Sequence, residues 1–133
     1  MAYVISYASC AVVMGILDFL WLTNMVSSVY RPAIGSLLAD KPNMGGAIAF
    51  YIIYIVGIQI FAVRPALATA DWRTALVYGA LFGFFSYATY DLTNLATLKD
   101  WSLKVSLIDM AWGLTLTAVT ASAGAFAALK LIR

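Results

Sequence analysis

The sequence lacks histidine and glutamate altogether, and Cys10 is the single cysteine among its 133 residues. Without histidine, neither a histidine-ligated haem nor a histidine-based zinc site can form within the chain. A lone cysteine excludes an intrachain disulfide scaffold. Charge is also scarce, because 11% of the residues are charged, against about 25% in typical globular proteins. The formal net charge of +2 is too small to indicate a nucleic-acid partner.

Apolar residues are correspondingly abundant. They make up 64% of the chain, whereas about 45–50% is usual for a globular domain. Each charge-free stretch approaches the roughly 20 residues that cross a bilayer core. This composition excludes a soluble domain and indicates a multi-pass integral membrane protein. The charge-free stretches are Met1–Leu17, Pro42–Val63, Thr74–Tyr90 and Met110–Leu129.

The apolar pattern predicts four membrane-spanning helices over residues 3–29, 45–63, 72–98 and 102–129. The first stretch has neither the basic flank nor the cleavage site of a signal peptide, so we expect it to be retained as a span. Short connections force neighbouring helices to run antiparallel. We therefore expect an all-α architecture: residues 1–133 form a single transmembrane domain, a four-helix bundle.

The connections between spans carry recognisable signals. Pro32 is placed to start a short interfacial helix between spans one and two. Arg64-Pro65 is expected to end span two, and Asp71 to cap the N-terminus of span three. The segment Lys99–Ser102 predicts a tight hairpin into span four.

The distribution of basic residues hardly favours one membrane orientation over the other. Four spans place both termini on one side, and the basic residues then divide four against four, so only the terminal amine favours a cytoplasmic N-terminus. Aromatic residues typical of a membrane-interface belt occur at Tyr30, Trp72 and Trp101.

Three carboxylates fall inside the spans or at their edges, namely Asp18, Asp91 and Asp109. A charge at the bilayer centre costs about 2.5–3.5 kcal/mol on insertion scales, so such residues are functional candidates by default. We expect all three to point inward, with Asp18 and Asp91 close enough to share a proton or a ligand.

Helical spacing predicts that polar groups gather around these acids. Residues i, i+4, i+8 and i+11 share a face in span three, and i, i+3 pairs share one in spans one and four. We therefore predict a ligand-binding pocket with aromatic walls. Its candidate residues are Asp18, Trp21, Tyr87, Asp91, Asn94, Asp109 and Trp112. The sequence assigns no catalytic residue, cofactor or metal ligand.

Each acid also has a purely structural interpretation. The segment Ser106–Asp109 fits a capping box, which would give Asp109 the role of closing the start of its helix. Asp18 could serve only as an interhelical hydrogen-bonding group. Asp91 has no capping role open to it, and Cys10 is expected to be a small packing residue.

Small residues four positions apart predict close helix packing in lipid. They are Ala11 and Gly15, Gly79 and Gly83, and the run Gly113, Thr117, Ala121 and Ala125.

The chain resembles a known family through five strings that together cover nearly its whole length. They are LDFLWLTN, YRPAIGSLL, FYIIYIVGIQIFAVRPAL, YATYDLTNLATLKDW and DMAWG. These strings are similar to the small bacterial inner-membrane proteins grouped as domain of unknown function 2177. The resemblance implies a four-helix protein of the bacterial inner (cytoplasmic) membrane and brings no established activity.

Three functions are compatible with the sequence. Polar groups converging among aromatic walls favour a protein of the bilayer that binds a lipidic or amphiphilic small molecule. Asp18 and the even charge balance also suit a small proton-coupled transporter of multidrug type, which would act as a homodimer. A buried Asp could instead be the general acid of a membrane enzyme acting on a lipid or isoprenoid, or three carboxylates could hold Mg²⁺. No Ser-His or Cys-His pair supports catalysis.

Overall fold

The computed structural model describes residues 1–132, in which every regular element is a helix or helical turn and none is a strand. This confirms the all-α fold class. The chain forms α1 (Ala2–Met25), η1 (Val26–Tyr30), α2 (Arg31–Ile34), η2 (Gly35–Leu37), α3 (Met44–Ile58), η3 (Gln59–Val63), α4 (Arg64–Thr69), α5 (Trp72–Thr97) and α6 (Leu103–Leu131). The segments η1 and η3 are π-helical turns, and η2 is a 3₁₀ turn.

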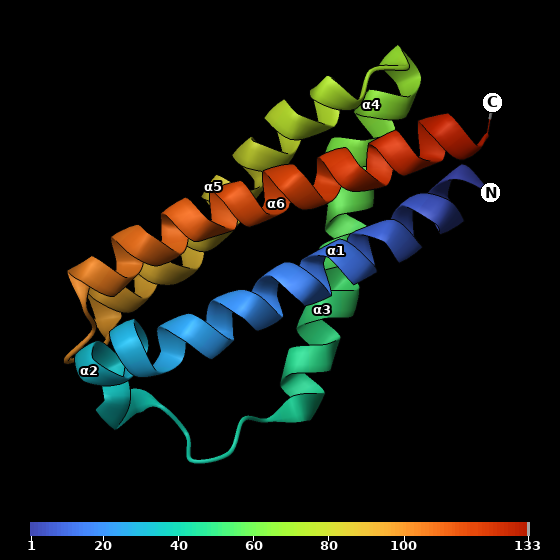
Figure 1. Cartoon of the computed structure of the whole chain (residues 1–133). Coiled ribbons are helices and arrows are strands. Elements are labelled where there is room, and N and C mark those ends of the chain that lie inside the picture. The colour runs from blue at the N-terminus through green and yellow to red at the C-terminus, as the bar shows by residue number, and fades with distance from the viewer. Residues whose placement is uncertain (133) are drawn as a thin grey trace.

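Three long helices, α1, α5 and α6, run beside one another, while α3 crosses them at a steep angle (Figure 1). The most extensive packing is between α5 and α6, followed by that between α1 and α6. The N- and C-termini lie at the same end of the bundle, and the α5–α6 hairpin lies at the other end with α2 (Figure 1).

Three helical segments are long and apolar enough to cross a membrane: Ala2–Leu37, Met44–Thr69 and Leu103–Leu131. The fourth long helix, α5, has 26 residues but is not among them. Polar side chains such as those of Tyr87, Asp91 and Asn94 lower its hydropathy. A membrane crossing by α5 therefore stays a prediction.

Two Arg-Pro pairs follow the two π turns in the same way. The backbone N–H of Arg31 donates to Val26 O, and that of Arg64 donates to Gln59 O. Proline lacks an N–H, and its ring collides with a carbonyl in a regular α turn, whereas a π turn opens the helix just before it. The helix therefore continues through both prolines.

Two expected boundaries change as a result. The expectation that Arg64-Pro65 ends span two is wrong, because the helix continues to Thr69 and ends where Ala70 takes a left-handed φ of 54°. The short helix α2 follows η1 without a break, so it extends α1 instead of standing apart from it.

Side-chain caps begin α3, α5 and α6. Asn43 accepts a hydrogen bond from Gly46 N, and Asp71 accepts one from Arg73 N, which confirms Asp71 as a cap. The cap of α6 is Ser102, which accepts from Val105 N. The capping-box interpretation of Asp109 is therefore wrong, because Asp109 lies about two turns inside the helix that Ser102 starts.

Glycines bring α5 against α6, as the small-residue pattern predicted. A Cβ added to Gly79 would lie 2.9 Å from Ala121 Cβ, and one added to Gly83 would lie 2.6 Å from Thr117 Cβ. The pattern is wrong for Gly15, whose added Cβ would meet nothing within 4 Å. Close approach of α1 to α6 depends instead on Gly124, where an added Cβ would lie 2.9 Å from Ser6 Oγ.

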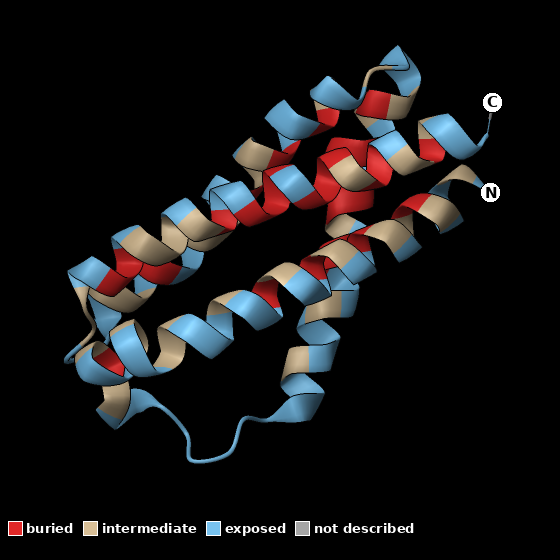
Figure 2. Cartoon of the chain, in the orientation of Figure 1, coloured by how far each residue is buried: buried red, intermediate tan, exposed pale blue. Residues whose placement is uncertain are grey.

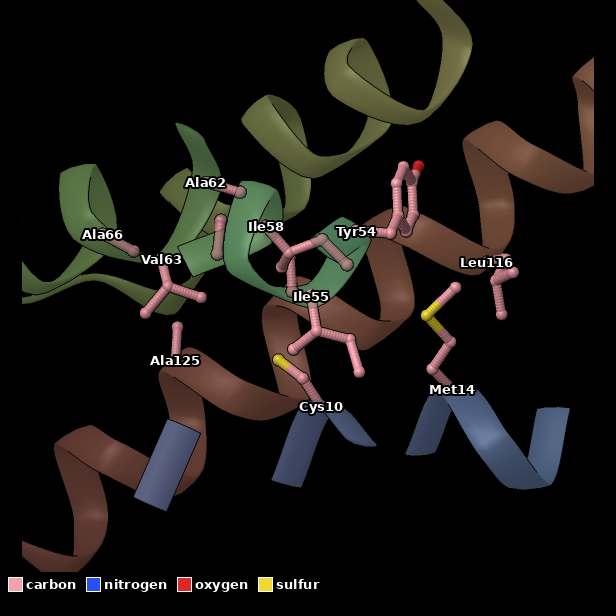
Figure 3. Close-up of a cluster of buried hydrophobic side chains, with 12 residues drawn as sticks. Cys10, Met14, Tyr54, Ile55, Ile58, Ala62, Val63, Ala66, Leu116 and Ala125 are labelled. Carbon is pink, nitrogen blue, oxygen red and sulfur yellow. The ribbon is translucent and has the colours of Figure 1, made fainter. Parts of the chain in front are cut away.

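The core lies where α3 and η3 cross α1 and α6. Buried residues concentrate along α6 and at this crossing, while the first turns of α3 are mostly exposed (Figure 2). Cys10 is fully buried there, and its Sγ donates to Thr120 O at 3.4 Å, in keeping with a packing residue. The side chains that fill the crossing include Cys10, Met14, Tyr54, Ile55, Ile58, Val63 and Leu116 (Figure 3).

Candidate functional site: an acidic pocket joined to an apolar groove

A cavity of about 420 Å³ lies between α1, η1, α3, α5 and α6. This volume is in the range of about 300–1,000 Å³ that is usual for small-molecule sites. We call it the acidic pocket, because two of its lining residues are aspartates and none is Lys or Arg. The lining residues are Asp18, Trp21, Leu22, Tyr30, Phe50, Tyr51, Tyr54, Ser86, Tyr87, Tyr90, Asp109 and Trp112.

Two stacked tryptophans join α1 to α6 inside the acidic pocket. The ring centroids of Trp21 and Trp112 are 4.3 Å apart, and the ring planes differ by 5°. Each indole follows an aspartate of its own helix by three residues, and i, i+3 side chains share a helix face. Since the two helices run antiparallel, the indoles meet while Asp18 and Asp109 lie on opposite sides of the stack.

Each indole N–H is linked by hydrogen bonds to the carboxylate of the other helix, one directly and one through a tyrosine hydroxyl. Trp112 Nε1 donates to Asp18 Oδ1 at 3.3 Å. Trp21 Nε1 donates to the Tyr30 hydroxyl at 3.0 Å, and this hydroxyl donates in turn to Asp109 Oδ1 at 2.9 Å. Asp18, which is buried, also accepts a hydrogen bond from the Tyr51 hydroxyl. The result is a reciprocal arrangement of two acids, two indoles and two phenols.

Asp91 and Asn94 lie outside the lining of the acidic pocket, although the sequence analysis proposed both as ligand-binding residues. Both follow Tyr87 on one face of α5, but α6 covers that face beyond the pocket. Asp91 is fully buried, and neither of its carboxylate oxygens has a hydrogen-bond partner among the described residues. Asn94 is half-buried.

The carboxyl that interacts with Asp91 is that of Asp109. The hydrogen bonds of Asp18 go instead to Tyr51 and Trp112. Among the described residues no hydrogen bond joins Asp18 to Asp91, and Asp109 is the acid whose charge acts on Asp91, because α5 and α6 form one closely packed hairpin. Within residues 1–132, the acids form no cluster suited to a metal ion.

Sequence reasoning missed the tyrosines that complete the pocket. Tyr30 was assigned to an interfacial belt, yet its hydroxyl lies between Trp21 and Asp109. Tyr51 and Tyr54 come from α3, whose other residues are all apolar or glycine. A phenol in such a span needs a polar partner, and this was the available signal. Tyr51 donates to Asp18, and Tyr54 pairs with Thr117 Oγ1 at 2.7 Å.

A second cavity of about 420 Å³ adjoins the acidic pocket between α1 and α3. We call it the apolar groove. It shares Leu22 and Tyr51 with the acidic pocket and contains no charged residue. Its lining residues are Tyr7, Ala11, Met14, Gly15, Phe19, Leu22, Ile48, Tyr51, Ile52 and Ile55.

The helical architecture, together with segments long and apolar enough to span a bilayer, places the chain in the class of helical membrane proteins. It belongs to the family described as "Predicted membrane protein (DUF2177)", which matches residues 3–126. No similar protein was found among curated proteins or among solved structures.

Proposed function

We propose that the protein binds an amphiphilic or lipidic molecule within the membrane. The polar head would lie in the acidic pocket, and the hydrocarbon chain would lie in the apolar groove. The observation that carries the proposal is the junction of the two cavities at Leu22 and Tyr51. It places a set of hydrogen-bonding groups beside an aliphatic channel, as an amphiphile requires.

The polar end of this combined site is deep, and its rim is apolar. Asp18 is 9% exposed at the bottom of the acidic pocket, whereas Leu22 and Phe50 at its edge are 44% and 43% exposed. A ligand entering from the lipid would first meet apolar surface and then the carboxylates. Buried acids that are hydrogen-bonded but not ion-paired cost free energy in a membrane, and a ligand role accounts for their presence in the pocket.

The apolar groove has room for a chain because two small residues of α1 face it. Ala11 and Gly15 line the groove, and the space next to Gly15 is open. Elsewhere in the bundle, small residues bring helices into contact. Here they leave a channel, which supports a ligand chain as the occupant.

We place the protein in the bacterial cytoplasmic membrane, with the N-terminus in the cytoplasm. The basic residues divide equally between the two sides of the membrane, and the positive charge of the terminal amine favours the cytoplasm for the N-terminus.

The proposal is tested by filling the groove. In Gly15→Leu the new side chain enters open space, so the protein should fold while the groove is blocked. Ala49→Leu is the matched control, because Ala49 is exposed on α3 and lines neither cavity. The measurements are the lipids retained in native mass spectrometry of gently solubilised protein and the affinity for dodecanol followed by tryptophan fluorescence.

We expect wild type and Ala49→Leu to retain lipid and bind dodecanol with equal affinity. Gly15→Leu should lose both while keeping a wild-type melting temperature. Equal retention and affinity in all three proteins would contradict the proposal.

A further inference from the structure

The two carboxylates of the acidic pocket keep free acceptor sites, although the hydrogen-bond donors beside them are already used. The indole N–H groups of Trp21 and Trp112 are already donated inside the protein, as are the hydroxyl protons of Tyr30 and Tyr51. A carboxylate offers about four lone-pair sites. Asp18 accepts two of these hydrogen bonds, and Asp109 accepts one. The four donors that flank the carboxylates are therefore used, while both carboxylates keep free lone-pair sites.

The aromatic rings add further negative partial charge to the lining of the acidic pocket. Eight of the twelve lining residues are Trp, Tyr or Phe. The faces of such rings carry negative partial charge and attract cations placed within about 6 Å. The lining holds two aspartates and no Lys or Arg that could neutralise them. Asp91, which is fully buried and follows the lining residue Tyr90 on α5, adds a third carboxyl near the pocket.

Resting on the proposed function, we propose that the acidic pocket selects amphiphiles with a cationic organic head, that is, an alkylammonium group. Such a head brings positive charge and, where it carries N–H, hydrogen-bond donors. The lining supplies no positive charge of its own, and the free lone pairs of its two carboxylates can accept such donors. An anionic head would meet two carboxylates with no opposing charge, and a neutral head would leave the buried acids uncompensated.

Two sources could supply this chemistry, namely a lipid with a quaternary ammonium headgroup and a free cationic amphiphile. They differ in the phosphate that accompanies the cation in the lipid. Because the pocket lining contains no basic residue to receive a phosphate, the phosphate would have to stay outside the pocket, at its apolar rim.

The test compares three probes that share a twelve-carbon chain: dodecyltrimethylammonium, dodecylphosphocholine and dodecanol. The protein is purified in dodecyl maltoside, and Kd values come from tryptophan fluorescence, with native mass spectrometry counting the bound probe. We compare wild type with the Asp18→Asn/Asp109→Asn double variant. Asp100→Asn is the control for loss of a carboxylate outside the pocket, because Asp100 is exposed in the α5–α6 turn and its φ of 62° is one that Asn also adopts.

In wild type and Asp100→Asn, we expect Kd for dodecyltrimethylammonium to be lower than that for dodecanol by about tenfold, as a desolvated cation–π site supplies. The double variant should lose this preference while still binding dodecanol. If dodecylphosphocholine shares the preference, the cation comes from a lipid headgroup. If it does not, the ligand is a free cationic amphiphile.

Equal wild-type affinity for the cationic and neutral probes would overturn the cationic head but leave the amphiphile site intact. Binding of none of the three would overturn the proposed function itself. The wild-type comparison decides this point even if the double variant fails to fold.

Discussion

The hydroxyl of Tyr30 donates to Asp109 Oδ1 at 2.9 Å, although the two residues are 79 positions apart. Tyr30 ends the π turn η1, which adds a residue to the helical turn before Pro32. Such turns shift the direction of the side chains that follow them. The π turn therefore belongs to the site, because it sets the direction in which Tyr30 meets the last helix of the chain.

This relationship predicts the effect of Tyr30→Phe. The substitution removes the hydroxyl that donates to Asp109 and accepts from Trp21 Nε1. Since hydrogen bonds to charged groups contribute about 1.5–3 kcal/mol, we expect a loss of about 2 kcal/mol in the free energy of unfolding. Thermal or chemical unfolding in detergent measures it. Tyr78→Phe, at an exposed position on α5, should leave stability unchanged. A wild-type stability for Tyr30→Phe would show that this hydrogen bond is dispensable.

Replacement of Asp91 by asparagine is expected to stabilise the protein. Its oxygens are buried without a hydrogen-bond partner among the described residues, and Asp109 interacts with it. In Asp91→Asn the shape is kept, and the amide can donate to Asp109. We expect the free energy of unfolding to rise by about 1 kcal/mol, as one added hydrogen bond supplies. The exposed Asp100→Asn serves as the control. A lower melting temperature for Asp91→Asn would mean that the acid itself is needed for folding.

Replacement by alanine is expected to have opposite effects on stability at Gly83 and at Gly15. In Gly83→Ala the new methyl group would lie 2.6 Å from Thr117 Cβ, so α5 and α6 must separate. Overpacking of this kind costs about 1–3 kcal/mol. In Gly15→Ala the methyl group enters the open apolar groove, and the better helix propensity of alanine should stabilise the protein by up to about 1 kcal/mol. Unfolding measurements on both variants check the pair, and effects of the same sign would contradict it.

Labelling of single cysteines tests whether α5 crosses the membrane. Cys10 is fully buried and should not react with the maleimide, so any labelling comes from the added cysteine. If four helices cross, Ala2→Cys and Ile132→Cys should react with an impermeant maleimide from one side, and Asp40→Cys and Lys99→Cys from the other. If α5 does not cross, Lys99→Cys joins the side of Ala2→Cys, and Ile132→Cys moves to the opposite side. Labelling of each position from both sides would indicate a dual-topology dimer.

The sequence by itself determined the membrane class, the helical fold, the cap at Asp71 and the hairpin at Lys99–Ser102. These follow from composition, hydropathy and local hydrogen bonding, which act over a few residues. It also placed Asp18 and Trp21 on one helix face, and Asp109 and Trp112 on another, because i, i+3 spacing is a property of the helix alone.

Only the tertiary structure decided which residues meet. Local spacing puts Tyr87 and Asp91 on one face of α5, but the approach of α6 covers Asp91 and leaves Tyr87 in the pocket. Tyr51 reaches Asp18 because α3 crosses the bundle steeply, an angle that no periodicity encodes (Figure 1). The groove beside Gly15 is open for the same reason: whether a small residue brings helices together or leaves a gap depends on the path of the neighbouring helix.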